Sequence, residues 1–453
     1  MNDTGKRLEA LGCAVPEILL PAPGVDLEKW AVVACDQYTQ DRGYWEKVEA
    51  FTKGSPSALN IIFPEVYLGD SGRQERIKAI HQTMDSWLAG GILAPPRKGC
   101  MYIERIFGEN SCRQGLLMAL DLEQYDWRPE GRLMIRCTEG TLPERLPPRM
   151  DIRRGASLEI PHILVLIDDA DLSLFPALAK RAKASDPGRG ETGRSAYRSP
   201  LMQDSGEIAG WFLEDEEDWA FIAGCLEELS RRSLKRYGSA SQEPFLFAVG
   251  DGNHSLATAK NIWEEYKKTH AGEAGLDSHP LRWAMVEIGN LYDEGIRFEP
   301  IHRVLFGTDE ERLCKTLSSL PGFSVWEGTS RENLLDFVKD DRARGSRYGI
   351  LSAGGRKISL VESSETGIST TALQPLLDSF VRETGCGIDY IHGSGEVFRL
   401  AESGGATGIL LPPVRKNGLF ETVARKGPLA RKSFSMGEAA EKRFYLECRK
   451  LKR

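Results

Sequence analysis

The sequence predicts a mixed α/β protein, with mixed sheets and flanking helices arranged in two or more lobes. Short apolar runs at 163–167 and 245–249 have the length and composition of buried strands. Apolar residues recur at helical spacing within 73–88, and that pattern ends before Gly90 and Gly91, a common stop signal. With 453 residues the chain is too long for one average core, so two or three lobes of about 100–200 residues each are expected.

Alternation and helical periodicity predict the remaining elements in order. Further strands are expected at 101–106, 115–122, 158–167, 208–213, 283–288, 348–351, 357–361 and 408–411. A helix should follow 208–213 and run to Tyr237, another should cover 373–382, and a third should follow the strand at 245–249. This last helix should bury a stripe made of Leu256, Ala259, Ile262 or Trp263, and Tyr266.

These elements divide the chain into three lobes and one loop. The expected division is an N-terminal mixed α/β lobe at 1–183, a flexible loop at 184–200, a central lobe at 201–310 and a C-terminal α/β lobe with a basic tail at 311–453. The loop is rich in Gly, Ser, Arg and Pro and longer than most connections, so a lid near a cleft or a linker is expected there.

Composition excludes several classes of protein. A net charge of −7 argues against broad nucleic-acid binding, which needs a basic face. The apolar runs are far shorter than the roughly 20 residues of a membrane span, and no stretch suits secretion, so a cytoplasmic location is expected. The nine cysteines form no C-x-x-C pair, which favours free thiols over zinc, and neither haem nor flavin is expected. Oligomeric state is left open.

The segment Gly250–Ser255 is the strongest candidate site, because it joins a strand to a helix through Gly-Asp-Gly-Asn-His. Exposed backbone N–H groups and the positive end of the helix dipole suit an anion there. Asp251 can ligate a cation or accept a proton, and His254 can donate to phosphate. The predicted phosphate-binding residues of this loop are Gly250, Gly252, Asn253 and Ser255. The alternative is that Asp251, Asn253 or Ser255 merely caps the helix.

Three further segments combine cations with hydroxyls or carboxylates, a combination that can bind phosphate or a polar substrate. They are 138–145 with Glu139 and Arg145, 299–303 with His302 and Arg303 after a strand, and 431–437 with Lys432 and Ser433. Each can equally be a solvated loop, a surface ion pair or an exposed basic turn.

These segments, together with 34–39, Tyr44-Trp45, 160–162 and 389–393, resemble a family known as domain of unknown function 1015, over nearly the whole chain. More distantly, Asp251-Gly252-Asn253-His254 is similar to the Asp-Gly-x-His-Arg loop of the ParB and sulfiredoxin superfamily, which includes nucleotide hydrolases and free-serine kinases. That resemblance implies a ParB/sulfiredoxin-like strand-loop-helix unit in the middle of the chain and nucleotide phosphate at Gly252, Asn253 and His254. Ser255 replaces the arginine of that pattern, so Arg303 or Lys432 would have to supply its charge.

The leading hypothesis is an enzyme that binds a phosphorylated small molecule, a nucleotide with Mg²⁺, and transfers or hydrolyses a phosphoryl group. Asp251, His254 and Arg303 are expected to converge on one cleft as the catalytic groups, with Asp251 also holding the metal. The residues expected to contact the substrate are Asp36, Glu139, Arg145, His302 and His392. A non-catalytic ligand sensor and a ParB-like nucleic-acid-binding regulator remain as alternatives.

Overall fold

The computed structural model describes residues 3–108, 111–184, 194–238, 243–308, 310–340, 344–402 and 405–453. It confirms the mixed α/β class and forms two compact units. Unit 1 contains Met1–Cys137, Thr141–Ile296 and Glu438–Arg453, and unit 2 contains Thr138–Gly140 and Arg297–Gly437. Each unit is described by itself.

Unit 1 is built on a 10-stranded mixed sheet with the order β11-β12-β5-β6-β14-β10-β13-β8-β7, and β1 pairs with β6. Its strands are β1 (Cys13–Ala14), β5 (Cys100–Phe107), β6 (Ser111–Asp121), β7 (Tyr125–Asp126), β8 (Ile135–Cys137), β10 (Leu164–Ile167), β11 (Ser195–Pro200), β12 (Glu207–Leu213), β13 (Phe247–Asp251) and β14 (Trp283–Asn290). Most central positions are buried, as expected for strands covered on both faces.

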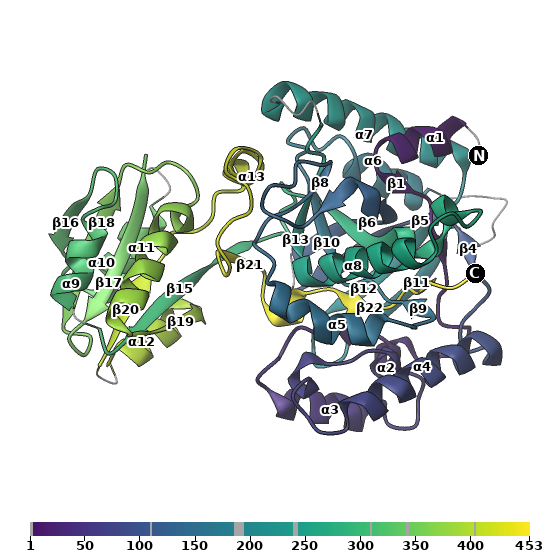
Figure 1. Ribbon diagram of the computed structural model, residues 1–453, viewed down its shortest axis with the longest axis horizontal. Coiled ribbons are helices and arrows are strands. Elements are labelled where there is room, and N and C mark those ends of the chain that lie inside the picture. Colours follow the sequence, from purple (N-terminus) through teal and green to yellow (C-terminus); the bar gives the residue numbers. More distant parts are fainter. Residues whose placement is uncertain are drawn as a thin grey trace. The chain divides into compact units, whose positions relative to one another are not determined.

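Side chains of each strand alternate between two hydrophobic cores, one on each face of the sheet. Met101 and Ile103 of β5 belong to one core, and Cys100 and Tyr102 belong to the other. Figure 1 shows the corresponding helices gathered on opposite sides of this sheet, α2 to α4 on one and α1, α6 and α7 on the other. The helices are α1 (Asp3–Ala10), α2 (Leu27–Trp30), α3 (Arg42–Thr52), α4 (Arg73–Gly90), α5 (Leu146–Arg153), α6 (Phe175–Ala182), α7 (Glu216–Tyr237) and α8 (Asn253–Thr269).

The predicted buried stripe of the helix after β13 is confirmed for α8. Leu256, Ala259, Ile262 and Trp263 are all buried, and Tyr266 packs partly buried against the same core. α4 continues through Gly90, past the predicted end, and Gly91 directly after the helix adopts a left-handed conformation with φ of 74°.

Two local predictions are corrected. The expected strand 158–167 is two strands, β9 (Leu158–Glu159) and β10, because Pro161 interrupts the segment and lacks the N–H that a central strand donates. The expected loop 184–200 ends in β11, which pairs antiparallel with β12 from Ser195 to Pro200. Residues 185–193 of that loop lie outside the described residues, and its role as a lid stays a prediction.

Unit 2 has a 7-stranded sheet with the order β16-β18-β17-β20-β15-β19, and β21 pairs with β15. Its strands are β15 (Phe298–Phe306), β16 (Ser324–Glu327), β17 (Ser346–Ser352), β18 (Lys357–Ser363), β19 (Gly387–His392), β20 (Ala406–Leu410) and β21 (Phe434–Met436). Its helices are α9 (Glu310–Leu317), α10 (Arg331–Lys339), α11 (Ser369–Thr384), α12 (Ser394–Glu402) and α13 (Leu419–Lys426). The cluster 299–303 therefore lies inside β15 and not after a strand.

The N-terminal and central lobes expected from the sequence share one sheet. β14 pairs with both β6 and β10, and β13 lies between β10 and β8, so the central segment completes the N-terminal sheet. The chain then forms most of unit 2 and returns to unit 1, where β22 (Phe444–Tyr445) pairs with β3 (Val32–Val33) and β23 (Arg449–Lys450) pairs with β9. We call Glu438–Arg453 the C-terminal segment.

All nine cysteines are free, as predicted. Within the described residues, every helix is too short or too polar to cross a membrane.

Candidate functional site

The turn between β13 and α8 requires a glycine at position 252. Gly252 has φ of 80°, and a Cβ at this position would come within 3.0 Å of the side chain of Ile163. Gly252 is also the residue that precedes the first turn of α8, and it has no side chain that could cap the helix. The alternative in which Asp251, Asn253 or Ser255 acts only as the helix cap is therefore not what the structure has.

Asp251 ends β13 beside a lysine from the C-terminal segment. One carboxylate oxygen lies 3.1 Å from Nζ of Lys442, and the other accepts the N–H of Gly252 at 3.0 Å. Burial alone would raise the pKa of Asp251, but the charge of Lys442 and these hydrogen bonds outweigh it, so the pKa lies below its usual value. Asp251 is thus an ionised carboxylate at neutral pH.

Asn253 and His254 begin α8 and differ in their partners. Oδ1 of Asn253 is buried and has no hydrogen-bond partner among the described residues. Nε2 of His254 accepts the backbone N–H of Leu142 at 3.3 Å, so a neutral His254 carries its proton on Nδ1. A buried oxygen without a partner is costly, which makes Asn253 a candidate for contact with a ligand.

Ser255 starts a chain of hydrogen bonds that leads to the C-terminal segment. Its Oγ lies 2.9 Å from Nε2 of His162, and Nδ1 of His162 lies 2.9 Å from the hydroxyl of Tyr445. The Tyr445 oxygen also accepts the backbone N–H of Cys35 at 3.1 Å. Strand pairing explains the arrangement, because Leu164 lies opposite Asp251 and this brings the residues before β10 next to the end of β13.

A pocket of about 140 Å³ opens beside this chain. Ser255, His162 and Tyr445 line it, and its remaining wall is largely apolar. Other lining residues include Ile61, Phe63, Met84, Ile152, Leu158 and Ile160. The pocket therefore combines an apolar wall with a few convergent polar groups, as small-molecule sites do.

Two ion pairs also border the pocket. Glu65 pairs with Arg149, and burial raises the pKa of Glu65. Glu159 pairs with Arg153 and Arg449. Burial opposes its ionisation, but the two guanidinium groups lower the pKa of Glu159 to about 2. Both carboxylates have cationic partners. The charged groups in this mostly apolar wall therefore add little net charge to the pocket.

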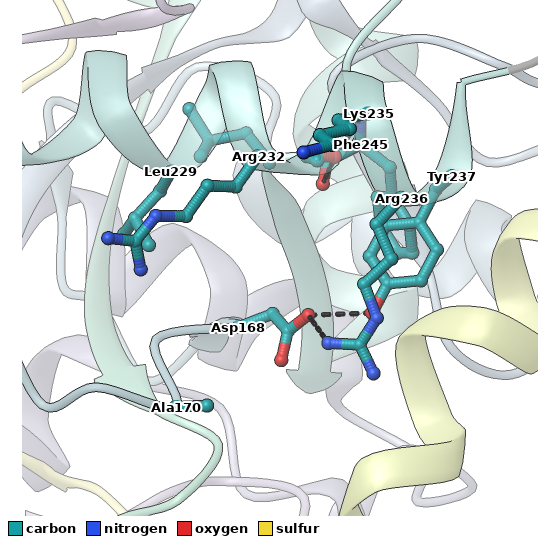
Figure 2. A pocket seen from close by; sticks show the side chains of 10 residues that line it. Asp168, Ala170, Leu229, Arg232, Lys235, Arg236, Tyr237 and Phe245 are labelled. Atoms are coloured by element: carbon teal, nitrogen blue, oxygen red, sulfur yellow. Dashed lines mark hydrogen bonds and ion pairs between the residues drawn. The ribbon is translucent and has the colours of Figure 1, made fainter.

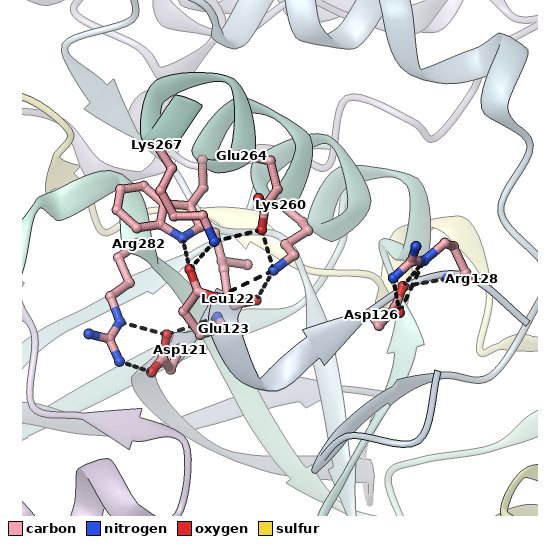
Figure 3. Close-up of polar contacts among 10 residues, drawn as sticks. Asp121, Leu122, Glu123, Asp126, Arg128, Lys260, Glu264, Lys267 and Arg282 are labelled. Carbon is pink, nitrogen blue, oxygen red and sulfur yellow. Dashed lines mark hydrogen bonds and ion pairs between the residues drawn. The ribbon is translucent and has the colours of Figure 1, made fainter. Parts of the chain in front are cut away.

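Polar contacts hold the far side of α8 in place (Figure 3). Glu123 accepts the indole N–H of Trp263 and the ammonium of Lys267, both at 2.6 Å, and Lys260 pairs with Glu264 at 2.8 Å. These contacts fix α8 against the 3₁₀ turn Leu122–Gln124, and so fix the direction of its first turn.

A larger pocket of about 420 Å³ lies elsewhere in unit 1, at the end of α7 (Figure 2). Its guanidinium groups already face carboxylates. Arg236 lies 3.2 Å from Asp168, which also accepts the hydroxyl of Tyr237 at 2.6 Å, and Arg232 pairs with Asp171. The charges of Arg232 and Arg236 are therefore compensated within this pocket.

The predicted site residues divide between the two units. Unit 1 contains Asp36, Arg145 and Gly250–Ser255, and unit 2 contains Glu139, His302, Arg303, His392, Lys432 and Ser433. Asp36 lies near the pocket, where its charge acts on Cys35 and Tyr445. Arg145 is exposed in a 3₁₀ turn before α5. The expected convergence of Asp251, His254 and Arg303 stays a prediction.

Within unit 2, Arg303 is fully buried on β15. It donates to Oε1 of Gln374 and to the carbonyl of Lys432, both at 2.9 Å, and its Nη2 has no partner among the described residues. His302 accepts the N–H of Leu411, and burial lowers its pKa to about 4. His392 lies opposite Ile301 in the sheet.

Glu139, in the part of unit 2 formed by Thr138–Gly140, contacts the basic segment 431–437. Its carboxylate accepts the backbone N–H groups of Ser433 at 3.1 Å and Lys432 at 3.3 Å. Burial nevertheless raises the pKa of Glu139. The backbone N–H groups of Lys432 and Ser433, whose cation and hydroxyl are predicted to bind phosphate, thus contact a carboxylate of the same chain.

Sequence reasoning missed Lys442 and Tyr445 and assigned no role to His162 or Glu65, whereas it placed Arg149 with Arg153 and Arg154 in an arginine run that could bind a polar substrate. The only available signal was that 160–162 and 34–39 belong to the family pattern. Among the described residues, no group of three or more His, Cys, Asp or Glu side chains could hold a metal ion.

Solved structures resemble the chain only weakly. A conserved hypothetical protein from Pyrococcus furiosus is 12% identical with a TM-score of 0.35, covering 74% of this chain and 95% of its own. A free serine kinase in complex with AMP is 10% identical with a TM-score of 0.37, covering 74% and 92%. SbnI from Staphylococcus aureus is 9% identical with a TM-score of 0.34, covering 71% and 82%. With TM-scores below 0.5, these similarities carry no argument about function. The link to the ParB and sulfiredoxin superfamily stays a prediction.

No curated protein matches the chain. The family model described as "Protein of unknown function (DUF1015)" matches residues 19–380, and the chain therefore belongs to this family.

Proposed function

We propose that unit 1 binds a phosphorylated small molecule, a nucleotide in the first instance, with phosphate at the first turn of α8, and transfers or hydrolyses a phosphoryl group there. The observation that carries the proposal is the position of Ser255, which belongs to the first turn of α8 and also lines the pocket. A phosphate at the helix start would therefore lie at the edge of a cavity suited to the rest of a ligand.

The chemistry of the helix start supports an anion. α8 is 17 residues long, follows a glycine and directs its positive dipole end at this point. Lys442 adds a cation. The unpartnered Oδ1 of Asn253 is an acceptor, so its partner would be a donor group of the ligand or a water and not a phosphate oxygen. In this proposal Gly250, Gly252, Asn253 and Ser255 contact phosphate.

Asp251 serves the metal in this proposal. Mg²⁺ in nucleotide enzymes is held by one or two carboxylates together with phosphate oxygens and water, so a single ionised carboxylate is sufficient. Lys442 would neutralise charge on the phosphate, which is the role that sequence reasoning gave to Arg303.

The test is a thermal-shift screen of the full chain with AMP, ADP, ATP and inorganic phosphate, with and without Mg²⁺. Ligand at about 100 times its Kd should stabilise unit 1 by about 2.7 kcal/mol. Asp251→Asn should stay folded and lower turnover more than binding, and His254→Ala should lose nucleotide-induced stabilisation. Stabilisation without turnover would support the alternative of a non-catalytic ligand sensor. If none of these compounds stabilised the protein, the proposed function would be rejected.

A further inference from the structure

We propose that Ser255 is a nucleophile and His162 its general base, so that unit 1 works through a covalent intermediate on Ser255. The inference deepens the proposed function and relies on it only for the identity of the group attacked. Its starting point is the distance of 2.9 Å between Oγ of Ser255 and Nε2 of His162. Both side chains line the pocket, so a ligand in the pocket would meet the pair directly.

A third group orients the base, as in other activated hydroxyl nucleophiles. The Tyr445 oxygen lies 2.9 Å from Nδ1 of His162 and is itself held by the backbone N–H of Cys35. With Nδ1 protonated and donating to Tyr445, Nε2 is the nitrogen that accepts the Ser255 proton. Tyr445 is thus a positioning residue that selects the productive tautomer of His162.

Two carboxylates lie close enough to His162 to interact with it electrostatically. Asp251 and Glu65 both interact electrostatically with His162, from β13 and from the 3₁₀ turn Glu65–Tyr67. Their own partners, Lys442 and Arg149, keep the surroundings from being strongly negative. The charged groups around the pair of Ser255 and His162 therefore largely compensate one another.

The proposed reaction uses a phosphate ester and water and proceeds in two steps. Oγ of Ser255 bonds to phosphorus, the bond from phosphorus to the leaving oxygen breaks, and the electron pair leaves with that oxygen. His162 takes the Oγ proton and delivers it to the leaving oxygen. Water then attacks phosphorus and the P–Oγ bond breaks, while His162 carries a proton from water to Oγ. An acceptor hydroxyl in place of water would give transfer instead of hydrolysis.

A fluorophosphonate probe tests the pair without knowledge of the substrate, because it reacts with base-activated serines and releases fluoride. Intact-mass and peptide analysis of the full chain should show one adduct, on Ser255, which is absent in Ser255→Ala. His162→Gln keeps a polar partner but no base, and should slow labelling by about 100-fold. Ser173→Ala is the matched control, because Ser173 is exposed and bonds a carboxylate of Asp169 at 3.0 Å instead of an imidazole, and labelling should be unchanged.

Two further variants separate chemistry from structure. Tyr445→Phe should slow labelling by about 10-fold, and imidazole added to His162→Ala should restore part of its labelling, which a purely structural role would not do. Wild-type protein that is folded but unlabelled at Ser255, or His162→Gln labelled at the wild-type rate, overturns the inference. Labelling of Ser255 without any thermal shift by nucleotides or phosphate would support the nucleophile and reject the proposed function.

Discussion

Two segments of this chain, Gly250–Ser255 and 431–437, are both predicted from the sequence to bind phosphate but differ in what they contact. In the second, the N–H groups of Lys432 and Ser433 bind the carboxylate of Glu139, and Oγ of Ser433 lies 2.7 Å from Thr370. In the first, Asp251 accepts the N–H of Gly252 and pairs with Lys442, an oxygen of Asn253 has no partner among the described residues, and a pocket lies alongside. Both segments therefore contact a carboxylate of the chain, and the pocket beside α8 is the difference that favours the first as a ligand site.

Segments distant in sequence create this difference. Thr138–Gly140 belongs to unit 2 and brings Glu139 to the basic segment, whereas the C-terminal segment belongs to unit 1 and brings Lys442 and Tyr445 to α8. The C-terminal segment is held by buried ion pairs, with Arg443 on Glu287 and Arg449 on Glu159. The site in unit 1 should therefore depend on these pairs, and the predictions below test that dependence.

Glu287→Gln should have the largest effect. Glu287 is 1% exposed and pairs with Arg443 and with Arg113, so the substitution leaves two guanidinium groups buried without a full counter-charge. The free energy of unfolding of unit 1 should fall by about 3–5 kcal/mol. Tryptophan fluorescence in urea measures this, since only Trp326 of the nine tryptophans belongs to unit 2. Glu264→Gln, which removes half-exposed pairs on α8, is the control and should cost at most about 1 kcal/mol.

Glu159 should make unit 1 sensitive to acid. Because the folded state lowers its pKa from 4.5 to about 2, its contribution is present above pH 4.5 and is lost as pH falls toward 2. The loss should be on the order of 3 kcal/mol. Urea unfolding at several pH values should therefore show a steeper acid decline for wild-type protein than for Glu159→Gln. Parallel declines would mean that Glu159 is not held ionised by Arg153 and Arg449.

Lys442→Ala should have an intermediate effect on stability and a strong one on binding. It leaves the ionised Asp251 without its cation, which should cost about 1–3 kcal/mol and raise the pKa of Asp251. Calorimetric titration with ADP should show most of the affinity lost. Lys426→Ala removes an exposed pair with Glu365 in unit 2 and should bind as wild-type does. Equal affinity in both variants would remove Lys442 from the site.

Glu139→Gln should have the smallest effect. Burial raises the folded pKa of Glu139, so its ionisation becomes a growing cost to unit 2 as pH rises above 4.5. A neutral glutamine removes that cost but accepts the two N–H groups less well, so the net change should stay within about 1 kcal/mol and should favour the variant more at pH 8 than at pH 5. Amide hydrogen exchange in peptides of unit 2 monitors its unfolding and measures this change in stability.

Local patterns could be predicted from the sequence because they depend on neighbouring residues. The buried stripe of α8 follows from helical spacing, and the turn at Gly252 follows from the glycine itself. The division into lobes could not be predicted, because β13 and β14 complete a sheet begun more than a hundred residues earlier. Tyr445 lies 283 residues from His162, and no local signal indicates that contact.

Amide hydrogen exchange with saturating ADP and Mg²⁺ compares the two segments in one experiment and tests the central claim most directly. Bound phosphate should slow exchange in peptides covering 250–256, because its oxygens accept N–H groups at the start of α8. Peptides covering 431–437 should exchange at the same rate with and without ligand, because Glu139 already binds their N–H groups. Protection confined to 431–437, or protection in neither segment despite measured binding, would contradict the account.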